Sequence, residues 1–401
     1  MRTVEEHQSV VNGLLAPLPV EQVALAAAAG RVLAADVPAL VPLPVFTNSA
    51  MDGYAARWAE VGGATADAPV RLPVAEDLPA GRTDSPPLAP GTVHRIMTGA
   101  PVPAGADVVV PVELTDAATD VVTITSSPVA GSHVRHAGED IAAGVVALAA
   151  GTALGPAQLG LAASLGHDVV PVRRRPRVVV LSTGSELVAP GTALRPGQIY
   201  ESNSVMLAAA VADAGGDPRT VHFVPDDVPQ FLATVRRELA GADLLVTSGG
   251  VSAGAYEVVK DAFRALGTVE FTKVAMQPGG PQGAGTVEGV PVFTLPGNPV
   301  SSFVSFEVFV RPALRRAMGS TAPDRLRTTA RLTAPLRSPA GRRQFLRGRF
   351  DAGEVSQVGG PGSHLVAHLA RANCLVVVPE DVTELPAGAD VTVVLIEGAL
   401  Q

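Results

Sequence analysis

Residues 177 to 318 alternate between short runs rich in Val and Leu and longer runs with helical spacing. The strand-like runs are RVVVLST, RTVHFVP, DLLVTS and PVFTLPG, and the helical runs are SNSVMLAAAVADAG, VPQFLATVRREL, EVVKDAFRAL and SSFVSFEVFVRPALRRAM. Alternation of this kind favours a parallel sheet with helices on both faces, because each parallel connection needs a crossover. The sequence therefore predicts a central three-layer αβα domain with a mostly parallel sheet over residues 176–320.

The regions on either side of this domain have different patterns of apolar residues, Pro and Gly. Helical apolar spacing in VEEHQSVVNGLL, PVEQVALAAAAGRVLAADV and LGPAQLGLAASLG predicts an N-terminal helical linker domain made of residues 1–45 and 146–175. Residues 46–145 and 321–401 carry short β-like runs broken by Pro and Gly. We therefore expect a multidomain α/β plus β chain, with an inserted small β domain at 46–145 and a C-terminal small β-barrel-like domain at 321–401.

Composition excludes several classes of protein. A formal net charge of −8 argues against nucleic acid and anionic membrane as partners. The single cysteine, Cys374, excludes an internal disulfide framework and a cysteine-rich metal site, and it suggests a reducing compartment. The sequence begins with an acidic, amphipathic stretch and has no apolar run of about 18 residues. We therefore expect a soluble cytoplasmic protein with no nucleic-acid or membrane partner.

Three of the predicted strands end in turns rich in small residues: LSTGSEL at 181–187, TSGGVSAG at 247–254 and LPGNPVSS at 295–302. Ligands of open parallel sheets bind beyond the carboxyl ends of the strands, so the three turns are predicted to line one crevice. Bare backbone N–H groups in such turns attract anions, and a phosphate-bearing ligand is the first hypothesis. Asn298 and Ser301 could cap the helix that follows and offer its first N–H groups to phosphate. The alternative is that each turn is only a tight connection with a cap.

Carboxylates surround these turns, and a phosphate site among carboxylates is electrostatically unfavourable unless a divalent cation lies between them. Mg²⁺ prefers oxygen ligands, which favours a magnesium site, although solvated surface acids are the alternative. Lys273 could neutralise phosphate as a point charge. The acids concerned are Glu186, Glu201, Asp226, Asp227 and Glu257.

The expected β domain has polar loops of its own. Asp52 follows NSAM, Thr98 lies in a frame of Gly and Pro, and VRHAGEDI supplies Arg135 and Asp140. From the residues alone these are rigid polar loops, and Arg135 with Asp140 could form a surface salt bridge. The histidines of HVRHAGEDI lack a helical HExxH frame, which disfavours zinc.

The stretches NSAMDGYA, RIMTGAPVPAGAD, VRHAGEDI, LSTGSEL, GQIYESNS, TSGGVSAG and LPGNPVSS, in this order, resemble the molybdopterin molybdenumtransferase family. The family is called MoeA in bacteria and the E domain of gephyrin in animals, and the resemblance covers essentially the whole chain. It implies an enzyme of molybdenum cofactor biosynthesis that takes molybdate and adenylylated molybdopterin, uses Mg²⁺, and releases AMP and molybdenum cofactor. It also implies a homodimer whose active site joins the α/β domain of one subunit to the β domain of the other. Further expected partners are the molybdopterin adenylyltransferase and recipient molybdoenzymes.

The resemblance also assigns roles to residues. Those implied to be catalytic are Asp52 and Thr98 from the partner chain, and Glu186, Asp226, Glu257 and Lys273 from the α/β domain. The implied Mg²⁺ ligands are Glu186, Asp226, Asp227 and Glu257. The residues implied to bind the pterin substrate are Ser182, Thr183, Gly184, Ser248, Gly249, Gly250, Ser252, Pro296, Gly297, Asn298, Ser301, Arg135 and Asp140.

The chain departs from the family pattern at five positions. Ser185, Glu201 and Glu257 stand where the family usually has Asp, and Gln277 and Gly280 stand where it commonly has Lys. One alternative is therefore a paralogue that binds pterin or nucleotide with weak or no insertase activity. A gephyrin-type interaction scaffold is another, which an aromatic content of 4% disfavours. The sequence has no GxGxxG turn, which disfavours a nicotinamide oxidoreductase.

Overall fold

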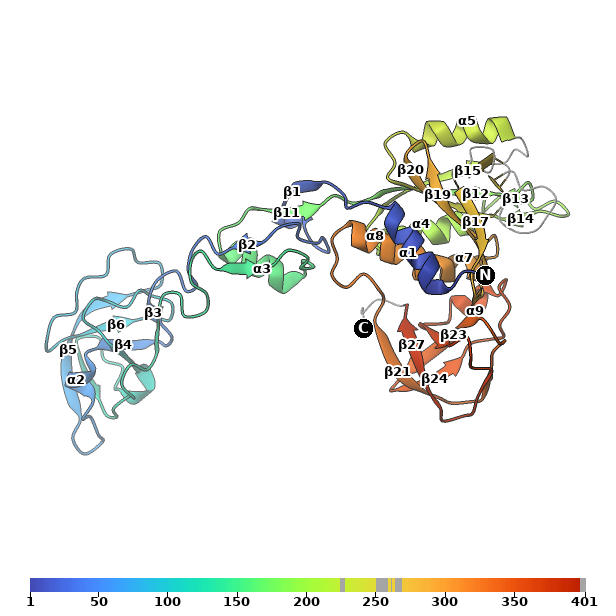
Figure 1. The fold of residues 1–401 in the computed structure, drawn as a ribbon. Coiled ribbons are helices and arrows are strands. Elements are labelled where there is room, and N and C mark those ends of the chain that lie inside the picture. Colours follow the sequence, from blue (N-terminus) through green and yellow to red (C-terminus); the bar gives the residue numbers. More distant parts are fainter. Residues whose placement is uncertain (224–227, 250–258, 261, 264–268, 397–401) are drawn as a thin grey trace.

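The computed structural model describes residues 1–223, 228–249, 259–260, 262–263 and 269–396. The molecule is elongated, with a small β domain at one end, narrow β ribbons in the middle, and an α/β domain with a C-terminal β domain at the other end (Figure 1). This arrangement agrees with the expected multidomain α/β fold class. The residue boundaries expected for the four parts remain predictions.

The α/β domain is built on a six-stranded sheet with the order β15-β12-β16-β20-β19-β17. Strands β15, β12, β16 and β20 run parallel, and β19 and β17 add an antiparallel edge. All four strands expected from the sequence are therefore present, whereas β17 and β19 were not predicted. Their bounds are β12 (Arg177–Thr183), β15 (Asp217–Phe223), β16 (Leu244–Ser248), β17 (Val269–Lys273), β19 (Pro281–Val287) and β20 (Val290–Leu295).

Helices cover both faces of this sheet. Val178 and Val180 of β12 pack into one cluster with α1, α4, α7 and α8, while Val179 and Leu181 pack into a second cluster with α5. Alternate residues of one strand are thus buried on opposite sides, as expected for a parallel sheet. The bounds are α1 (Val4–Leu14), α4 (Asn203–Asp213), α5 (Val228–Leu239), α7 (Pro299–Ser305), the π-helical turn η3 (Phe306–Val310) and α8 (Arg311–Ala317). Of the helix expected at 257–266, only Val259, Lys260, Ala262 and Phe263 are described, and these four are helical.

The expected helical linker is wrong in part. Residues 19–37 were expected to form a helix, but Val20–Ala24 form strand β1, which pairs antiparallel with β11 (Val169–Arg173). The physical reason is that burial along β1 alternates with a period of two, and the tertiary pairing outweighs the helix propensity of its alanines. In addition, α1 packs on the α/β domain through Val4 and Val11. The remaining linker elements are η1 (Leu25–Ala27), β2 (Val37–Pro38), β10 (Val146–Leu148) and α3 (Pro156–Ser164), and α3 is the helix expected near residues 154–166.

The inserted β domain has a five-stranded sheet with the order β7-β4-β6-β5-β8 and a short β3-β9 pair. Its core clusters draw only on residues between Tyr54 and Val134, so the domain buries its own apolar side chains. The bounds are β3 (Asn48–Ser49), β4 (Gly53–Ala56), α2 (Trp58–Val61), β5 (Val70–Leu78), β6 (Val93–Ile96), β7 (Val108–Pro111), η2 (Val112–Leu114), β8 (Val121–Ile124) and β9 (Val134–Arg135).

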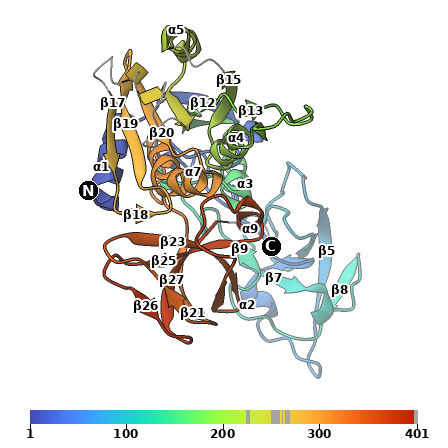
Figure 2. The ribbon, with the colours of Figure 1, turned by 90° about the vertical axis from the view of Figure 1, so that its right-hand side faces the viewer.

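The C-terminal domain lies beside the α/β domain (Figure 2) and closes into a small barrel. Its strands follow the order β18-β23-β24-β21-β27-β25, and an additional β23–β25 pairing closes the ring. The bounds are β18 (Met276–Gln277), β21 (Arg327–Leu332), β22 (Leu336–Arg337), β23 (Arg343–Asp351), β24 (Glu354–Gln357), α9 (Val366–Leu369), β25 (Cys374–Val378), β26 (Glu384–Leu385) and β27 (Asp390–Leu395).

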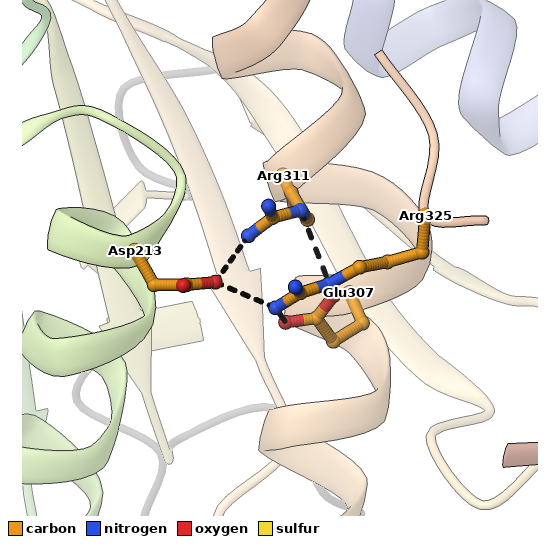
Figure 3. A network of polar contacts seen from close by, with 4 residues as sticks. All are labelled: Asp213, Glu307, Arg311 and Arg325. Carbon is orange, nitrogen blue, oxygen red and sulfur yellow. Dashed lines mark hydrogen bonds and ion pairs between the residues drawn. The ribbon is translucent and has the colours of Figure 1, made fainter. Parts of the chain in front are cut away.

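A network of ion pairs connects the α/β domain to the segment that enters the barrel (Figure 3). Arg325 contacts both carboxylate oxygens of Glu307, at 2.9 and 3.1 Å, and Asp213 at 2.6 Å. Arg311 also contacts Asp213 at 2.6 Å and lies 3.9 Å from Glu307. The Glu307 side chain is only 2% exposed, whereas that of Asp213 is 50% exposed. Helix α4, the π-helical turn and the start of the barrel are thereby held together.

Candidate functional site

A cleft of about 800 Å³ lies at the carboxyl ends of the parallel strands. The three turns predicted to line one crevice all contribute to it, together with the start of α4 and residues of the C-terminal domain. Nine of the expected site residues line it: Ser182, Thr183, Glu186, Ser248, Gly249, Pro296, Gly297, Asn298 and Ser301. Gly184 lies against the cleft, because a Cβ on it would meet the Glu186 carboxylate at 2.7 Å. Gly250 and Ser252 lie outside the described residues.

Asn203, the first residue of α4, links two of these turns. Its side-chain N–H₂ donates to Ser248 Oγ at 2.8 Å and to the Gly297 carbonyl at 2.7 Å. Its Oδ1 is buried and has no hydrogen-bond partner among the described residues. The hydroxyl of Ser182, a residue that is 3% exposed, is likewise buried without a described partner. Buried polar atoms of this kind are expected to pair with water or a ligand, so both residues point to a polar ligand in the cleft.

Gly249 allows the second turn to approach the first. Its φ is +96°, and a Cβ there would lie 2.8 Å from the Thr183 carbonyl oxygen. Its N–H donates to the Leu295 carbonyl at 3.1 Å. A side chain at this position would be strained and would push β12 and β16 apart, so glycine is required for the floor of the cleft.

The structure corrects the capping role expected for Asn298. This residue is the N-cap of α7, but its side chain makes no capping hydrogen bond. Instead its amide donates to Ser363 Oγ of the C-terminal domain at 2.9 Å, and the Val300 N–H donates to the Ser363 carbonyl at 3.1 Å. The third turn therefore fastens the barrel to the edge of the cleft.

Glu186 is the one expected Mg²⁺ ligand that can be placed. It is exposed and lines the cleft. Asp226, Asp227 and Glu257, the other expected acids, lie outside the described residues. Within the part of the chain that is described, no group of three or more His, Cys, Asp and Glu residues could hold a metal ion. The fifth acid of the sequence cluster, Glu201, is 4% exposed and accepts from the Ser204 N–H at 2.8 Å and from the Ser204 hydroxyl, so it caps α4.

Lys273 does not line the cleft. It is exposed at the end of β17 and borders a smaller cavity of about 210 Å³, which shares Pro281 with the cleft. Gln277 and Gly280 border the same small cavity. Gly280 lies outside the left-handed region, and a Cβ on it would make only ordinary contacts, the nearest 3.5 Å from the Val274 carbonyl oxygen. A side chain at position 280 would therefore fit without strain.

Asp52 and Thr98 form an exposed pair on the distant β domain. The Asp52 carboxylate accepts from the Thr98 N–H at 2.7 Å and from the Thr98 hydroxyl at 2.8 Å. These two hydrogen bonds, the backbone one first, lower the pKa of Asp52. Arg135 and Asp140 are exposed on the same domain. Within one chain, the β domain that carries these four residues lies at the opposite end of the molecule from the α/β domain, with the β ribbons between them (Figure 1).

Sequence models of known families match nearly the whole chain. They are the MoeA N-terminal region (domain I and II) over residues 2–166, the probable molybdopterin binding domain over 179–316 and the MoeA C-terminal region (domain IV) over 329–396. A protein of Mycobacterium tuberculosis (strain H37Rv) called molybdopterin molybdenumtransferase 2 is 56% identical over 98% of this chain and 99% of its own length. The chain belongs to the MoeA family of molybdopterin molybdenumtransferases.

Other relatives agree with this assignment. Molybdopterin molybdenumtransferase 1 of the same organism is 40% identical over 98% of each chain. A crystal structure of the molybdopterin biosynthesis MoeA protein from Pyrococcus horikoshii OT3 superposes with a TM-score of 0.86 at 28% identity, covering 98% of this chain and 100% of that one. A second structure of a MoeA protein from this archaeon gives a TM-score of 0.84 at 32% identity, with 99% of both chains covered. Members of the MoeA family are enzymes of molybdenum cofactor biosynthesis. Among the described residues of this member, no helix is long and apolar enough to cross a membrane.

Sequence reasoning missed several residues of the MoeA cleft. Asn203 and Ser202 lie in the motif GQIYESNS, but nothing in that motif shows that the Asn203 side chain reaches Gly297, 94 residues away. His364 and Val366 come from the barrel and line the cleft as well. The signal that could have found Asn203 is its position in the first turn of an apolar helix at the carboxyl edge of the sheet, where ligands of parallel sheets bind. No local pattern marks His364 or Val366.

Proposed function

We propose that the chain inserts molybdate-derived molybdenum into adenylylated molybdopterin and releases AMP and molybdenum cofactor. The observation that carries the proposal is the cleft, in which hydroxyl, amide and carboxylate groups from three strand ends converge. Clefts at this edge of a parallel sheet are the usual ligand sites of such folds. The relatives named above are molybdopterin molybdenumtransferases, and their name identifies the substrate that we propose for the cleft.

The polar groups of the cleft suit a phosphoanhydride with attached hydroxyl and amide groups. The Ser182 hydroxyl can donate to a phosphate oxygen, and Asn203 Oδ1 can accept from a ligand N–H or O–H, which would satisfy both buried atoms. Cleavage is a hydrolysis: a water oxygen bonds to one phosphorus of the phosphoanhydride, its P–O bond breaks, and AMP leaves, so negative charge must be stabilised at the phosphates. Fixed donors at the strand ends would perform this task without reorganising.

Mg²⁺ belongs to the proposal as well. The Glu186 carboxylate and the Ser182 hydroxyl, which has no partner among the described residues, are two hard oxygen donors of the kind that this ion prefers, and the described residues supply no cluster of acids beside them. We expect Glu186 to hold the ion together with Asp226, Asp227 and Glu257. When bound, Mg²⁺ would supply charge neutralisation at the phosphoanhydride.

We further propose that the active enzyme is a homodimer in which the β domain of one chain completes the cleft of the other. Asp52 and Thr98 are ordered by each other and exposed, yet they lie far from the cleft of their own chain. The hydrogen bonds from Thr98 lower the pKa of Asp52 and fix its carboxylate, which can accept a hydrogen bond from an N–H or O–H group of the substrate. A second copy of the chain would bring this pair to the cleft.

The test is molybdate-dependent AMP release from adenylylated molybdopterin by the purified protein, alongside rescue of molybdoenzyme activity in a strain that lacks its own insertase. We expect AMP and molybdenum cofactor to appear together, and Ser182→Ala and Glu186→Gln each to lower the rate while the circular dichroism spectrum is unchanged. A folded wild-type protein that binds the substrate but releases no AMP would instead indicate the binding-only paralogue. A protein that shows neither binding nor rescue would refute the proposal.

A further inference from the structure

A second pocket, of about 740 Å³, opens directly beside the cleft. Both cavities are lined by Tyr200, Glu201, Ser202 and Val366, so the two share one wall. Tyr200 belongs to β14 (Ile199–Tyr200), which pairs with β13 (Leu187–Val188) just after the first turn of the cleft. A ligand whose polar part lies in the cleft can therefore extend past Tyr200 into this second pocket.

The second pocket is apolar, in contrast to the cleft. Its walls are formed by α4, α7, α9 and the end of β27, through the side chains of Val205, Met206, Phe303, Leu369, Ala370, Ala372 and Ile396. Glu201 is the charged group at its edge, and its carboxylate is already engaged with the N–H and hydroxyl of Ser204. A charged or strongly hydrated group would lose its water here without gaining comparable hydrogen bonds, so the pocket favours an apolar or aromatic occupant.

Large apolar side chains are left open to solvent at the mouth of this pocket. Tyr200 is 45% exposed, Val205 60% and Val366 45%. A cavity of this size lies within the range of about 300–1,000 Å³ that is usual for small-molecule sites, and such sites combine apolar walls with a few polar groups. The apolar pocket and the polar cleft together match a ligand that has a flat ring at one end and phosphate next to it.

We propose that the apolar pocket is a ring subsite, which takes a planar nitrogen heterocycle joined to the phosphate that the cleft holds. The inference rests on the proposed function, because adenylylated molybdopterin carries such a ring, adenine or pterin, on either side of its phosphoanhydride. Tyr200, at the junction of the two cavities, offers its ring as a stacking surface, and aromatic side chains stack on nucleobases irrespective of their identity. The pocket thereby fixes the direction in which the substrate lies across the cleft.

The test compares ligands with and without a ring. Isothermal titration calorimetry would measure binding of AMP, a pterin monophosphate and ribose 5-phosphate to the full-length protein. We expect at least one ring-bearing ligand to bind tenfold or more tightly than ribose 5-phosphate, and the tighter of the two identifies which ring occupies the pocket. Equal affinities for all three ligands would overturn the proposal.

Two variants at and just after the short helix α9 separate the pocket from the surrounding surface. Ala370 follows α9, is exposed and lines the pocket, so Ala370→Trp would fill the cavity without disturbing the core. Ala367 is also exposed on α9 but does not line the pocket, which makes Ala367→Trp the matched control. Ala370→Trp should remove the advantage of the ring-bearing ligand and leave ribose 5-phosphate binding within twofold, and Ala367→Trp should change neither.

Tyr200 provides an independent readout of stacking. Tyr200→Phe should retain the advantage of the ring, and Tyr200→Ala should lose tenfold or more of it. If Ala370→Trp changes only the sedimentation coefficient, the pocket is a contact between chains and the proposal is wrong. Molybdate-dependent AMP release is measured on the same proteins: insertion without a ring advantage refutes the subsite alone, and a ring advantage without insertion refutes the proposed function alone.

Discussion

Removal of Arg325 should destabilise the chain far more than a surface ion pair would. In the variant Arg325→Met, the Glu307 carboxylate, 2% exposed, loses the two hydrogen bonds at 2.9 and 3.1 Å that it accepts from Arg325. Among the described residues, the cation that remains beside it is Arg311, at 3.9 Å. Removing one partner of a buried pair costs about 3–5 kcal/mol, because the remaining charge is buried without compensation. Since Arg311 stays nearby, we expect a loss of about 3 kcal/mol.

Two further variants of the same network (Figure 3) separate burial from charge. Asp213 contacts both arginines at 2.6 Å but is 50% exposed, so Asp213→Asn should cost less than about 1 kcal/mol. The double variant Arg325→Met with Glu307→Leu removes the buried charge together with its partner. It should recover most of the stability that Arg325→Met loses, because replacing a whole buried pair by apolar groups is often close to neutral.

The assay is urea unfolding followed by circular dichroism, with hydrogen exchange of the 299–317 helix as a local readout. A chain with several domains need not unfold in one step, so the local readout identifies the transition to which the network belongs. The reasoning would be refuted by a loss below about 1 kcal/mol for Arg325→Met, which is the level of a surface pair. A double variant as unstable as the single one would refute it equally.

Three other predictions concern the shared site, the pH dependence and the missing lysines. A 1:1 mixture of Asp52→Ala and Glu186→Ala chains, each inactive alone, should regain about a quarter of wild-type AMP release after subunit exchange, because half of the dimers then hold one intact site; continued inactivity in a verified mixed dimer would contradict a site shared between chains. Burial, with a smaller contribution from the charge of Arg2, lowers the pKa of His7 to about 4, so the unfolded chain binds more protons below pH 6.5 and stability should fall by roughly 2 to 4 kcal/mol between pH 6.5 and 4. His7→Phe should flatten that part of the stability profile in urea titrations at several pH values, and an unchanged slope would show that His7 is not the group responsible. Gln277→Lys with Gly280→Lys should tighten molybdate or pterin binding severalfold and steepen its salt dependence in calorimetry at two ionic strengths; unchanged affinity in a folded double variant would mean that the small cavity does not face the anion.

The parallel part of the sheet and its three turns could be predicted because the information is local. Each of the four strands is a short apolar run followed by small residues, and parallel strands bring their carboxyl ends together whatever the details of packing. The cleft residues on those turns were therefore found without knowledge of the structure. The same argument could not reach His364 or Asn203, whose contributions depend on contacts across the chain.

The sequence did not predict the antiparallel edge strands β17 and β19, and one pair of residues explains why for β19. Gly283 of β19 stands opposite Thr294 of β20, and a Cβ on Gly283 would lie 2.1 Å from the Thr294 hydroxyl. Glycine is required there by its neighbour, yet it has low strand propensity, so the segment PQGAGTV reads as a loop. The alanines of residues 24–29 led to the wrong prediction of a helix. The adjoining residues form strand β1 instead, because they pair with β11.

The route by which the chain enters and leaves the β domain has a consequence for how such a protein can be altered. Val37 pairs with Leu148 and Pro38 with Val146, so the outgoing and returning strands lie side by side. A two-residue turn could join them as a hairpin and replace everything between. The apolar clusters on one side of this junction share no residues with those on the other. The β domain is thus a module whose removal would leave the cores of the rest of the chain intact, so a chain shortened at this hairpin should still fold and would lose only the contribution of Asp52 and Thr98 to the proposed shared site.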